Sequence, residues 1–470
     1  MYNVILLTVD CLRADRLGTM GNSKGLTPNL DALAFQSTFF TSAFAVGPRT
    51  PESFPAILAS TYPLTFNADW CLPETLTTLA EVLQGAGYAT AAFHSNPYLS
   101  LNLGYGKGFD SFWDSMETTS VVSKLASRAK STIKRESTIY RFFRRIARHV
   151  ETQAEVSYYT RAEEVNKRAI NWLQGQKSPF FLWLHYMDLH YPFNPPVPFV
   201  HRVRSEGISK ALQADIVARS LEKPETITQT ETQVLEDLYN AGLLYVDEGI
   251  GNFLDNLRQM GLFDKTLICV TADHGEEFLE HGDFGHGIKI HLLEDNRPIL
   301  KLYDELLHVP LLLYFPTSII TPSRNPSLVS LIDLAPTLVD FLSIKVPAGW
   351  QGQSLLPLLT RNEGESRSGV FSQYAVREGA KRWPIVSYRT KDWKLIYDSV
   401  KQQHELYYLD KDPYEKNNLY ATRPSVLIEL EVAIQQHLKD IRGESFKTTG
   451  VTAGMTLEMQ ERLRGLGYIE

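Results

Sequence analysis

The sequence predicts an α/β fold with a mostly parallel central sheet flanked by helices. Two short apolar runs, residues 4–7 and 267–270, each lead directly into acidic residues, Asp10 and Asp273. Such runs are typical of parallel strands that are buried on both faces. Strand-like and helix-like segments alternate through the first two thirds of the chain, which favours parallel strands joined by helical crossovers.

Prolines and glycines indicate where the expected helices and strands begin and end. Pro28 suits the first turn of a helix over residues 27–34, because a proline there loses no hydrogen bond. Gly85 and Gly261 are typical helix ends, and Pro316 closes a strand. We therefore expect helices at residues 27–34, 75–84 and 235–260, and strands at residues 4–7, 89–93, 180–184, 267–270 and 309–315.

The pattern changes near residue 363. Residues 369–374, 385–388 and 393–397 read as short antiparallel strands, and a helix is expected at residues 426–441. We predict a large α/β domain over residues 1–365 and a small C-terminal α+β subdomain over residues 366–470. No internal repeat is evident.

Composition narrows the class of protein. The 470 residues carry a formal net charge of −7, which argues against nucleic acid as a partner, since that partner needs clustered basic residues. Three cysteines cannot form a disulfide framework. The chain opens directly with an expected strand, and no apolar run approaches about 20 residues. A cytoplasmic location without a stable membrane anchor is therefore expected.

A basic insertion is expected at about residues 115–160. Nine Lys and Arg residues between positions 124 and 148 are almost unopposed by acids, and apolar residues recur at helical spacing beside them. The segment reads as an amphipathic helix that packs on its own domain. The alternatives are a lid that attracts an anionic substrate, and peripheral contact of residues 124–150 with an anionic membrane.

Asp10, Asp273 and His274 predict a metal site, because ligands collect beyond the carboxyl ends of parallel strands. For Asp10, a turn or capping role is the alternative. Cys11 could bind a soft metal, but we expect it to pack beneath the site. Glu276 and Glu277 are expected to orient His274. The glycine-rich residues 281–287, with two histidines, are expected to form a flexible loop.

Thr50 lies in a proline-rich segment, residues 45–63, that leads into a short helix. It could simply cap that helix. A hydroxyl held between a helix N-terminus and a metal would also be a competent nucleophile toward a phosphoryl or sulfuryl group.

Taken together, these residues resemble the sulfatase family of the alkaline phosphatase superfamily. The resemblance covers nearly the whole chain. It rests on the opening segment 9–18, the segment 27–31, a substrate-side loop at 185–193, the metal loop 273–276 and the following segment 302–310. Near the C-terminus, residues 406–419 and the closing 466–468 also look like family signatures.

The nucleophile segment departs from that family. Sulfatases of the main type carry Cys or Ser, then Pro two residues later and Arg four later, and convert the first residue to formylglycine. The matching positions here are Thr50, Glu52 and Phe54. Threonine would give a ketone rather than an aldehyde, so no formylglycine is expected. Arg49 or Arg13 could replace the absent Arg.

The resemblance then implies a site with one divalent metal ion (Mn, Zn or Ca), as in phosphonate monoester hydrolase-like members. Its implied ligands are Asp10, Thr50, Asp273 and His274. The implied catalytic residues are Thr50, His190 and His286. The implied substrate-binding residues are Arg13, Arg49, Asp188 and Lys289.

The expected reaction is hydrolysis of sulfate or phosphate esters in a small-molecule, glycan or lipid substrate. A phospho-group transferase, a phosphonate or phosphodiester hydrolase and a catalytically degenerate binding protein are the alternatives. The sequence leaves the natural substrate and the oligomeric state open.

Overall fold

Eight strands form the central sheet in the order β4-β3-β5-β1-β6-β7-β2-β8. The computed structural model describes residues 1–66, 71–115, 159–177, 179–287, 300–316, 320–360, 367–378 and 381–442. Strand β7 runs antiparallel to both neighbours, whereas the other pairs are parallel. The strands are β1 Asn3–Val9, β2 Thr38–Phe44, β3 Ala89–Phe93, β4 Ser111–Trp113, β5 Phe180–Tyr186, β6 Thr266–Ala272, β7 Leu311–Tyr314 and β8 Ser323–Ser330.

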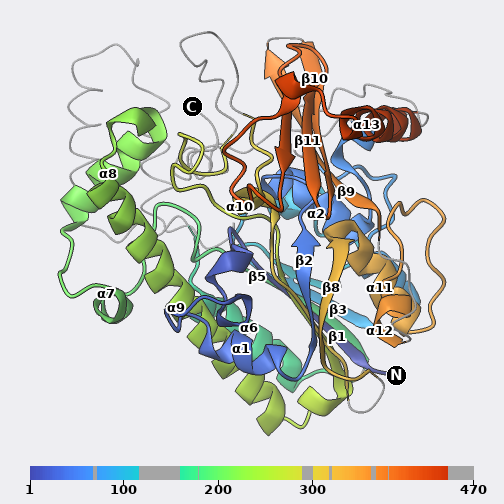
Figure 1. The fold of residues 1–470 in the computed structure, drawn as a ribbon. Coiled ribbons are helices and arrows are strands. Elements are labelled where there is room, and N and C mark those ends of the chain that lie inside the picture. The colour runs from blue at the N-terminus through green and yellow to red at the C-terminus, as the bar shows by residue number, and fades with distance from the viewer. Residues whose placement is uncertain are drawn as a thin grey trace, which may run out of the picture.

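Helices cover both sides of this sheet, as the sequence predicts. Helices α1, α6 and α9 pack together on one side, while α2, α3, α11 and α12 gather on the other (Figure 1). The described helices are α1 Pro28–Ala34, α2 Thr50–Ala59, α3 Leu79–Gly85, α6 Ala162–Gln174, α7 Val197–Val203, α8 Lys210–Glu222, α9 Gln229–Gln259, α10 Asp304–Leu307, α11 Leu334–Phe341, α12 Leu356–Thr360 and α13 Val426–Arg442.

The middle strands are buried from end to end. Every residue of β1, β5 and β6 is buried. Because helices cover both faces, these strands carry continuous apolar runs instead of alternating polar and apolar residues. Because β1 and β6 pair in parallel, both end at the same edge of the sheet.

Two helix starts differ from the prediction, and capping explains both. Helix α3 begins at Leu79 rather than residue 75, after a capping box between Thr78 and Glu81. Helix α9 begins at Gln229, ahead of residue 235, after the matching box between Thr228 and Glu231. In each case two backbone N–H groups are satisfied, which sets the first turn independently of the apolar pattern.

A second sheet of four antiparallel strands forms the C-terminal part, in the order β12-β11-β10-β9. Helix α13 packs against β10 and β11 (Figure 1). The strands are β9 Gly369–Glu378, β10 Lys381–Thr390, β11 Trp393–Asp398 and β12 Glu405–Tyr408. The predicted division at residues 365 and 366 falls outside the described residues.

This second sheet supports the segment that leads into α2. The N–H of Gln373 donates to the carbonyl of Val46 at 2.7 Å, and the Ser372 hydroxyl donates to the carbonyl of Ala45 at 2.6 Å. The chain just before Thr50 is therefore held by strand β9. Most of the basic insertion, Lys289 and residues 466–468 lie outside the described residues.

Candidate functional site

Adjacent parallel strands bring Asp10 and Asp273 together. Val9, the last residue of β1, pairs with Ala272, the last residue of β6, so the two aspartates follow at the same level of the sheet. Strand β5 lies on the other side of β1 and pairs His185 with Thr8. All these side chains are buried. The prediction that these strand ends share one edge is confirmed.

The hydroxyl of Thr50, the first residue of α2, lies among these groups. Its Oγ1 donates to Oδ2 of Asp273 at 3.0 Å and lies 3.5 Å from both Oδ2 of Asp10 and Nε2 of His274. Asn96 donates through Nδ2 to Asp10 Oδ2 at 3.0 Å. A hydroxyl, two carboxylates and an imidazole nitrogen thus converge on one point.

The donor set fits a divalent cation. Ligand atoms of Asp10, Asp273 and His274 lie within 4.8 Å of one another. Burial and the nearby Asp10 carboxylate raise the pKa of Asp273 to about 6. The pKa of Asp10 is lowered despite its burial, because His185 bonds its carboxylate and His190 and His274 lie close. Two buried carboxylates that crowd each other are the arrangement that a bound cation would stabilise.

Two more histidines lie beside this group. The rings of His286 and His274 have centroids 4.5 Å apart, and those of His190 and His286 are 4.9 Å apart. Burial lowers the pKa of His190 to about 4 and that of His286 well below its usual range. Both imidazoles are therefore neutral near pH 7 and offer N–H donors in place of positive charge.

The residues around His274 differ from the expectation. Glu276 contacts Nδ1 of His286 at 2.9 Å, and Glu277 pairs with Lys301 at 2.5 Å. The carbonyl of Gly275 instead contacts Nδ1 of His274 at 2.8 Å, which leaves Nε2 toward the carboxylates. The prediction that the two glutamates orient His274 was wrong, because each is held by a different buried partner.

Cys11 and the loop 281–287 lie close to this group. Cys11 is buried in the apolar core, as expected, and its Sγ also donates to Oδ1 of Asp10 at 2.9 Å. In the loop, Asp283, Phe284 and His286 are buried. The glycines there allow sharp turns, with positive φ at Gly282 and Gly285, and do not leave the histidines exposed.

Three of the residues predicted to bind substrate are ion-paired or hydrogen-bonded to other groups of the protein. Arg13 forms ion pairs with Asp15 and Glu280, and Arg49 pairs with Glu52. Asp188 accepts a bond from the N–H of Ala162 at the start of α6.

Phe54 stands where the resemblance leads one to expect Arg. Its ring packs edge-on against His185, with centroids 5.0 Å apart. The aromatic contact therefore occupies the place in which a charged side chain was expected.

Sequence reasoning missed two residues, His185 and Asn96. His185 Nε2 lies 3.2 Å from Asp10 Oδ2, and its Nδ1 lies 3.0 Å from the Thr8 hydroxyl. The available signal was a histidine at the polar end of an apolar strand. Asn96 lies in the loop after β3, at the same edge of the sheet, where a polar residue after a strand was again the signal.

Within the described part of the chain, we find no helix that is both long enough and apolar enough to cross a membrane.

Two protein-family models match this chain. The model of the sulfatase family matches residues 2–344. A second model, described as the C-terminal part of N-sulphoglucosamine sulphohydrolase, matches residues 293–444.

Curated relatives include an arylsulfatase of Clostridium perfringens, 23% identical over 457 residues, which span 89% of this chain and 90% of the relative. An N-acetylglucosamine-6-O-sulfatase of Bacteroides thetaiotaomicron is 33% identical over 250 residues, or 50% of this chain and 41% of the relative.

Solved structures give the same fold. The phosphonate monoester hydrolase of Agrobacterium radiobacter superposes with a TM-score of 0.70 at 22% identity, over 94% of this chain and 96% of that one. A protein solved with its substrate D-glucosamine-2-N,6-O-disulfate superposes with a TM-score of 0.69 at 20% identity, over 94% and 99% of the two chains.

Proposed function

The chain belongs to the sulfatase family, and we propose that it is a metal-dependent hydrolase of sulfate or phosphate esters with Thr50 as its nucleophile. One observation carries this proposal: the Thr50 hydroxyl lies 3.0 Å from Asp273 and 3.5 Å from both Asp10 and His274. Members of this family depend on a metal, and the donor set here suits one divalent ion held by Asp10, Thr50, Asp273 and His274.

When bound, the cation would supply a positive charge that lowers the pKa of the Thr50 hydroxyl and offsets the charge of the ester. The proton of Thr50 passes to Asp273, which already accepts its hydrogen bond. The Thr50 oxygen then bonds to sulfur or phosphorus as the bond to the leaving alcohol breaks.

His190 and His286 act on the ester oxygens in this proposal. An incoming anionic ester raises the pKa of a nearby imidazole, so one of the two takes up a proton from solvent as the ester binds. The resulting imidazolium protonates the departing alcohol and becomes neutral again. Water then attacks the Thr50 ester and returns its proton to that imidazole, and Thr50 recovers its proton from Asp273.

The chemistry of threonine also favours a second candidate, a hydrolase of phosphonate esters or phosphodiesters. Thr50 cannot become formylglycine, so the aldehyde hydrate used by sulfatases of the main type is not formed here. The fold shared with a phosphonate monoester hydrolase is compatible with this candidate. A transferase differs only in that a second alcohol takes the place of water.

The experiment is a matched activity panel on metal-analysed protein. The substrates are aryl esters of sulfate, phosphate and phosphonate, an aryl phosphodiester, and N-acetylglucosamine 6-sulfate because of the 33% identical relative. Turnover of at least one ester is expected. Thr50→Ala should lower turnover at least about a thousandfold, because the nucleophile is removed, and should still bind the metal through Asp10, Asp273 and His274.

Thr50→Ser is the matched control, because it keeps the hydroxyl and should restore part of the activity. If Thr50→Ala retained more than roughly a tenth of the activity, water would be the direct nucleophile and the role of Thr50 would be wrong. Silence on every ester with the metal bound would contradict the hydrolase and favour a transferase or a binding protein.

A further inference from the structure

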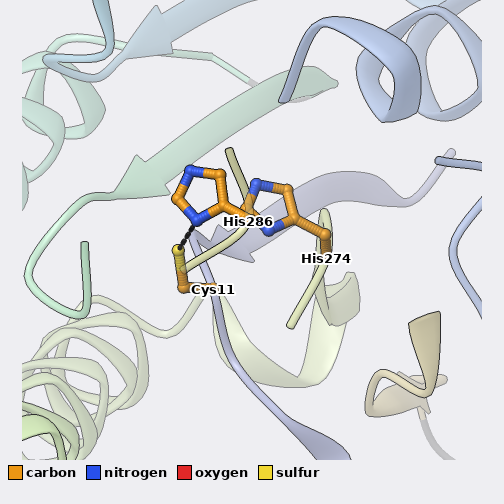
Figure 2. A group of neighbouring side chains, drawn as sticks. All are labelled: Cys11, His274 and His286. Atoms are coloured by element: carbon orange, nitrogen blue, oxygen red, sulfur yellow. Dashed lines mark hydrogen bonds between the residues drawn. The ribbon is translucent and has the colours of Figure 1, made fainter. Parts of the chain in front are cut away.

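Cys11 points into a group of metal-binding side chains. Figure 2 shows its sulfur facing His286, with His274 beside them, and the Sγ–Nδ1 distance to His286 is 3.6 Å. Ligand atoms of Cys11, His274 and His286 lie within 4.8 Å of one another. All three side chains are buried. This sulfur takes no part in the ester chemistry proposed above.

Asp10 connects this group to the proposed cation site. Its Oδ2 faces Thr50 and Asn96, whereas its Oδ1 accepts the Cys11 thiol at 2.9 Å and lies 3.8 Å from His274 Nε2. The Cys11 sulfur therefore lies within hydrogen-bond distance of one of the carboxylates that would hold the cation.

The backbone at Cys11 fixes this direction. Its φ of 61° lies in the left-handed region, and its carbonyl accepts the hydroxyl of buried Tyr239 at 2.7 Å. The same hydroxyl accepts the N–H of Arg13 at 3.1 Å. Tyr239 thus holds the backbone at both Cys11 and Arg13 through hydrogen bonds, which keeps the thiol directed at Asp10.

A second observation next to this group points to a ligand. Glu276 is fully buried, and its Oε1 contacts His286. Within the described part of the chain, its Oε2 has no hydrogen-bond partner. A buried carboxylate oxygen without a partner is costly, so it indicates that positive charge or a donor is present nearby in the functional protein.

We propose that Cys11 is a thiolate ligand of the cation held by Asp10, Asp273 and His274, and that it makes the site prefer Zn²⁺ to Ca²⁺ or Mg²⁺. Ca²⁺ and Mg²⁺ take oxygen ligands, whereas a sulfur, nitrogen and carboxylate set suits Zn²⁺. On binding, the S–H bond breaks, a sulfur–metal bond forms and one proton leaves to solvent. The inference rests on the proposed function, since both use the same cation.

Cobalt(II) provides a direct test, because it takes zinc sites and a thiolate ligand gives an intense charge-transfer absorption in the near ultraviolet. Metal-free protein is titrated with Co²⁺ while the spectrum is recorded. We expect this absorption in the wild type to saturate at one equivalent. It should be absent from Cys11→Ser, which keeps the weaker visible absorption of the bound cobalt.

The two other cysteines give matched controls. Cys71→Ser and Cys269→Ala remove sulfurs outside the site and should both keep the near-ultraviolet absorption, and circular dichroism checks that each variant folds. A charge-transfer absorption that persists in Cys11→Ser, or is missing from a wild type that binds Co²⁺, overturns the thiolate ligand.

The spectra also separate this inference from the proposed function. If Asp273→Asn abolishes the visible cobalt absorption but the wild type shows no thiolate absorption, the cation site stands and only the role of Cys11 fails. If Co²⁺ produces no absorption in the wild type, the cation site itself fails and the proposed function with it.

The preference for Zn²⁺ over Ca²⁺ is measured by letting the two cations compete for the wild type and for each Cys11 variant. Cys11→Ser should weaken Zn²⁺ binding by roughly tenfold to a hundredfold, at least as much as losing an outer partner of a metal ligand. Ca²⁺ binding should change little in Cys11→Ser and become stronger in Cys11→Asp, which adds an oxygen ligand. Equal losses for both cations would overturn the claim of selectivity.

Discussion

Asp188 shows how one buried carboxylate makes stability depend on pH. Burial raises its pKa to about 7, despite the hydrogen bond from the N–H of Ala162. In the unfolded chain an Asp titrates near about 3.9. Between these values the folded protein holds a proton that the unfolded chain has lost, so the free energy of unfolding falls as pH rises.

Asp188→Asn should remove this contribution, because an amide has the same shape and its oxygen can still accept the Ala162 N–H. The difference in free energy of unfolding between variant and wild type should grow in favour of the variant from about pH 4 to about pH 7, at no more than roughly 1.4 kcal/mol per pH unit. Urea unfolding across that range measures it. A constant difference would mean that Asp188 is ionised throughout.

The positions of some residues of the proposed site could be predicted from the sequence, and those of others could not. That Asp10, Asp273 and His274 lie together could be predicted, because ligands collect beyond the carboxyl ends of parallel strands. His185 could not, because a histidine at the end of an apolar strand is equally typical of a core residue. Only the pairing of β5 with β1 shows that its ring reaches Asp10.

At the scale of elements, the close packing of residues 273–276 on α10 has a testable consequence. The N–H of Gly275 donates to the carbonyl of Leu306 at 2.8 Å, and a Cβ on Gly275 would lie 2.0 Å from the carbonyl oxygen of Glu305. Both contacts involve backbone, which cannot swing aside as a side chain can. Only glycine fits between Asp273 and α10 without moving one of them.

Gly275→Ala should therefore destabilise the protein by about 1–3 kcal/mol and weaken metal binding, because the clash displaces His274 and Asp273. Gly85→Ala is the matched control: nothing lies within 4 Å of its added Cβ, and alanine suits α3 better than glycine. Thermal unfolding and metal titration of both variants measure the effect. Unchanged metal affinity in Gly275→Ala would show that the loop adapts without moving its ligands.

Element types could be predicted better than element ends. The apolar runs of β1, β5 and β6 identify strands because burial on both faces demands them. The starts of α3 and α9 were misplaced because a capping box decides them, and its two side-chain bonds leave no trace in the apolar pattern.

For the molecule as a whole, both sheets help to position the residues of the one proposed site. Strand β9 bonds the backbone at Ala45 and Val46, which leads into Thr50, so the C-terminal sheet positions the proposed nucleophile. The sequence shows both sheets as separate patterns of strands. It could not show that they meet there, because one bond joins two backbone groups that any residue provides and the other needs only a single serine hydroxyl.

Buried ion pairs centred on Lys394 also connect the second sheet to helix α10. Lys394 of β11 is fully buried, and its Nζ lies 2.8 Å from Asp304 of α10 and 2.7 Å from Glu415. Arg389 of β10 also pairs with Asp304, at 3.1 Å. Glu415 has no such second cation among its described partners, so the loss of Lys394 would leave a buried carboxylate without a counter-charge.

At a pH at which Glu415 is ionised, Lys394→Met should lower the free energy of unfolding by about 3–5 kcal/mol, because methionine fills the space but leaves that charge unpaired. Lys411→Met is the matched control: Lys411 is exposed and pairs with exposed Asp410, so its loss should change stability by less than about 0.5 kcal/mol.

Denaturant unfolding of both variants measures these changes, and activity measured at denaturant concentrations below the unfolding transition tests whether the ion pairs also support the site. Because the second sheet holds the approach to Thr50, Lys394→Met should lose activity at a lower denaturant concentration than the wild type. If the two variants were equally stable, these ion pairs would not hold the second sheet to α10.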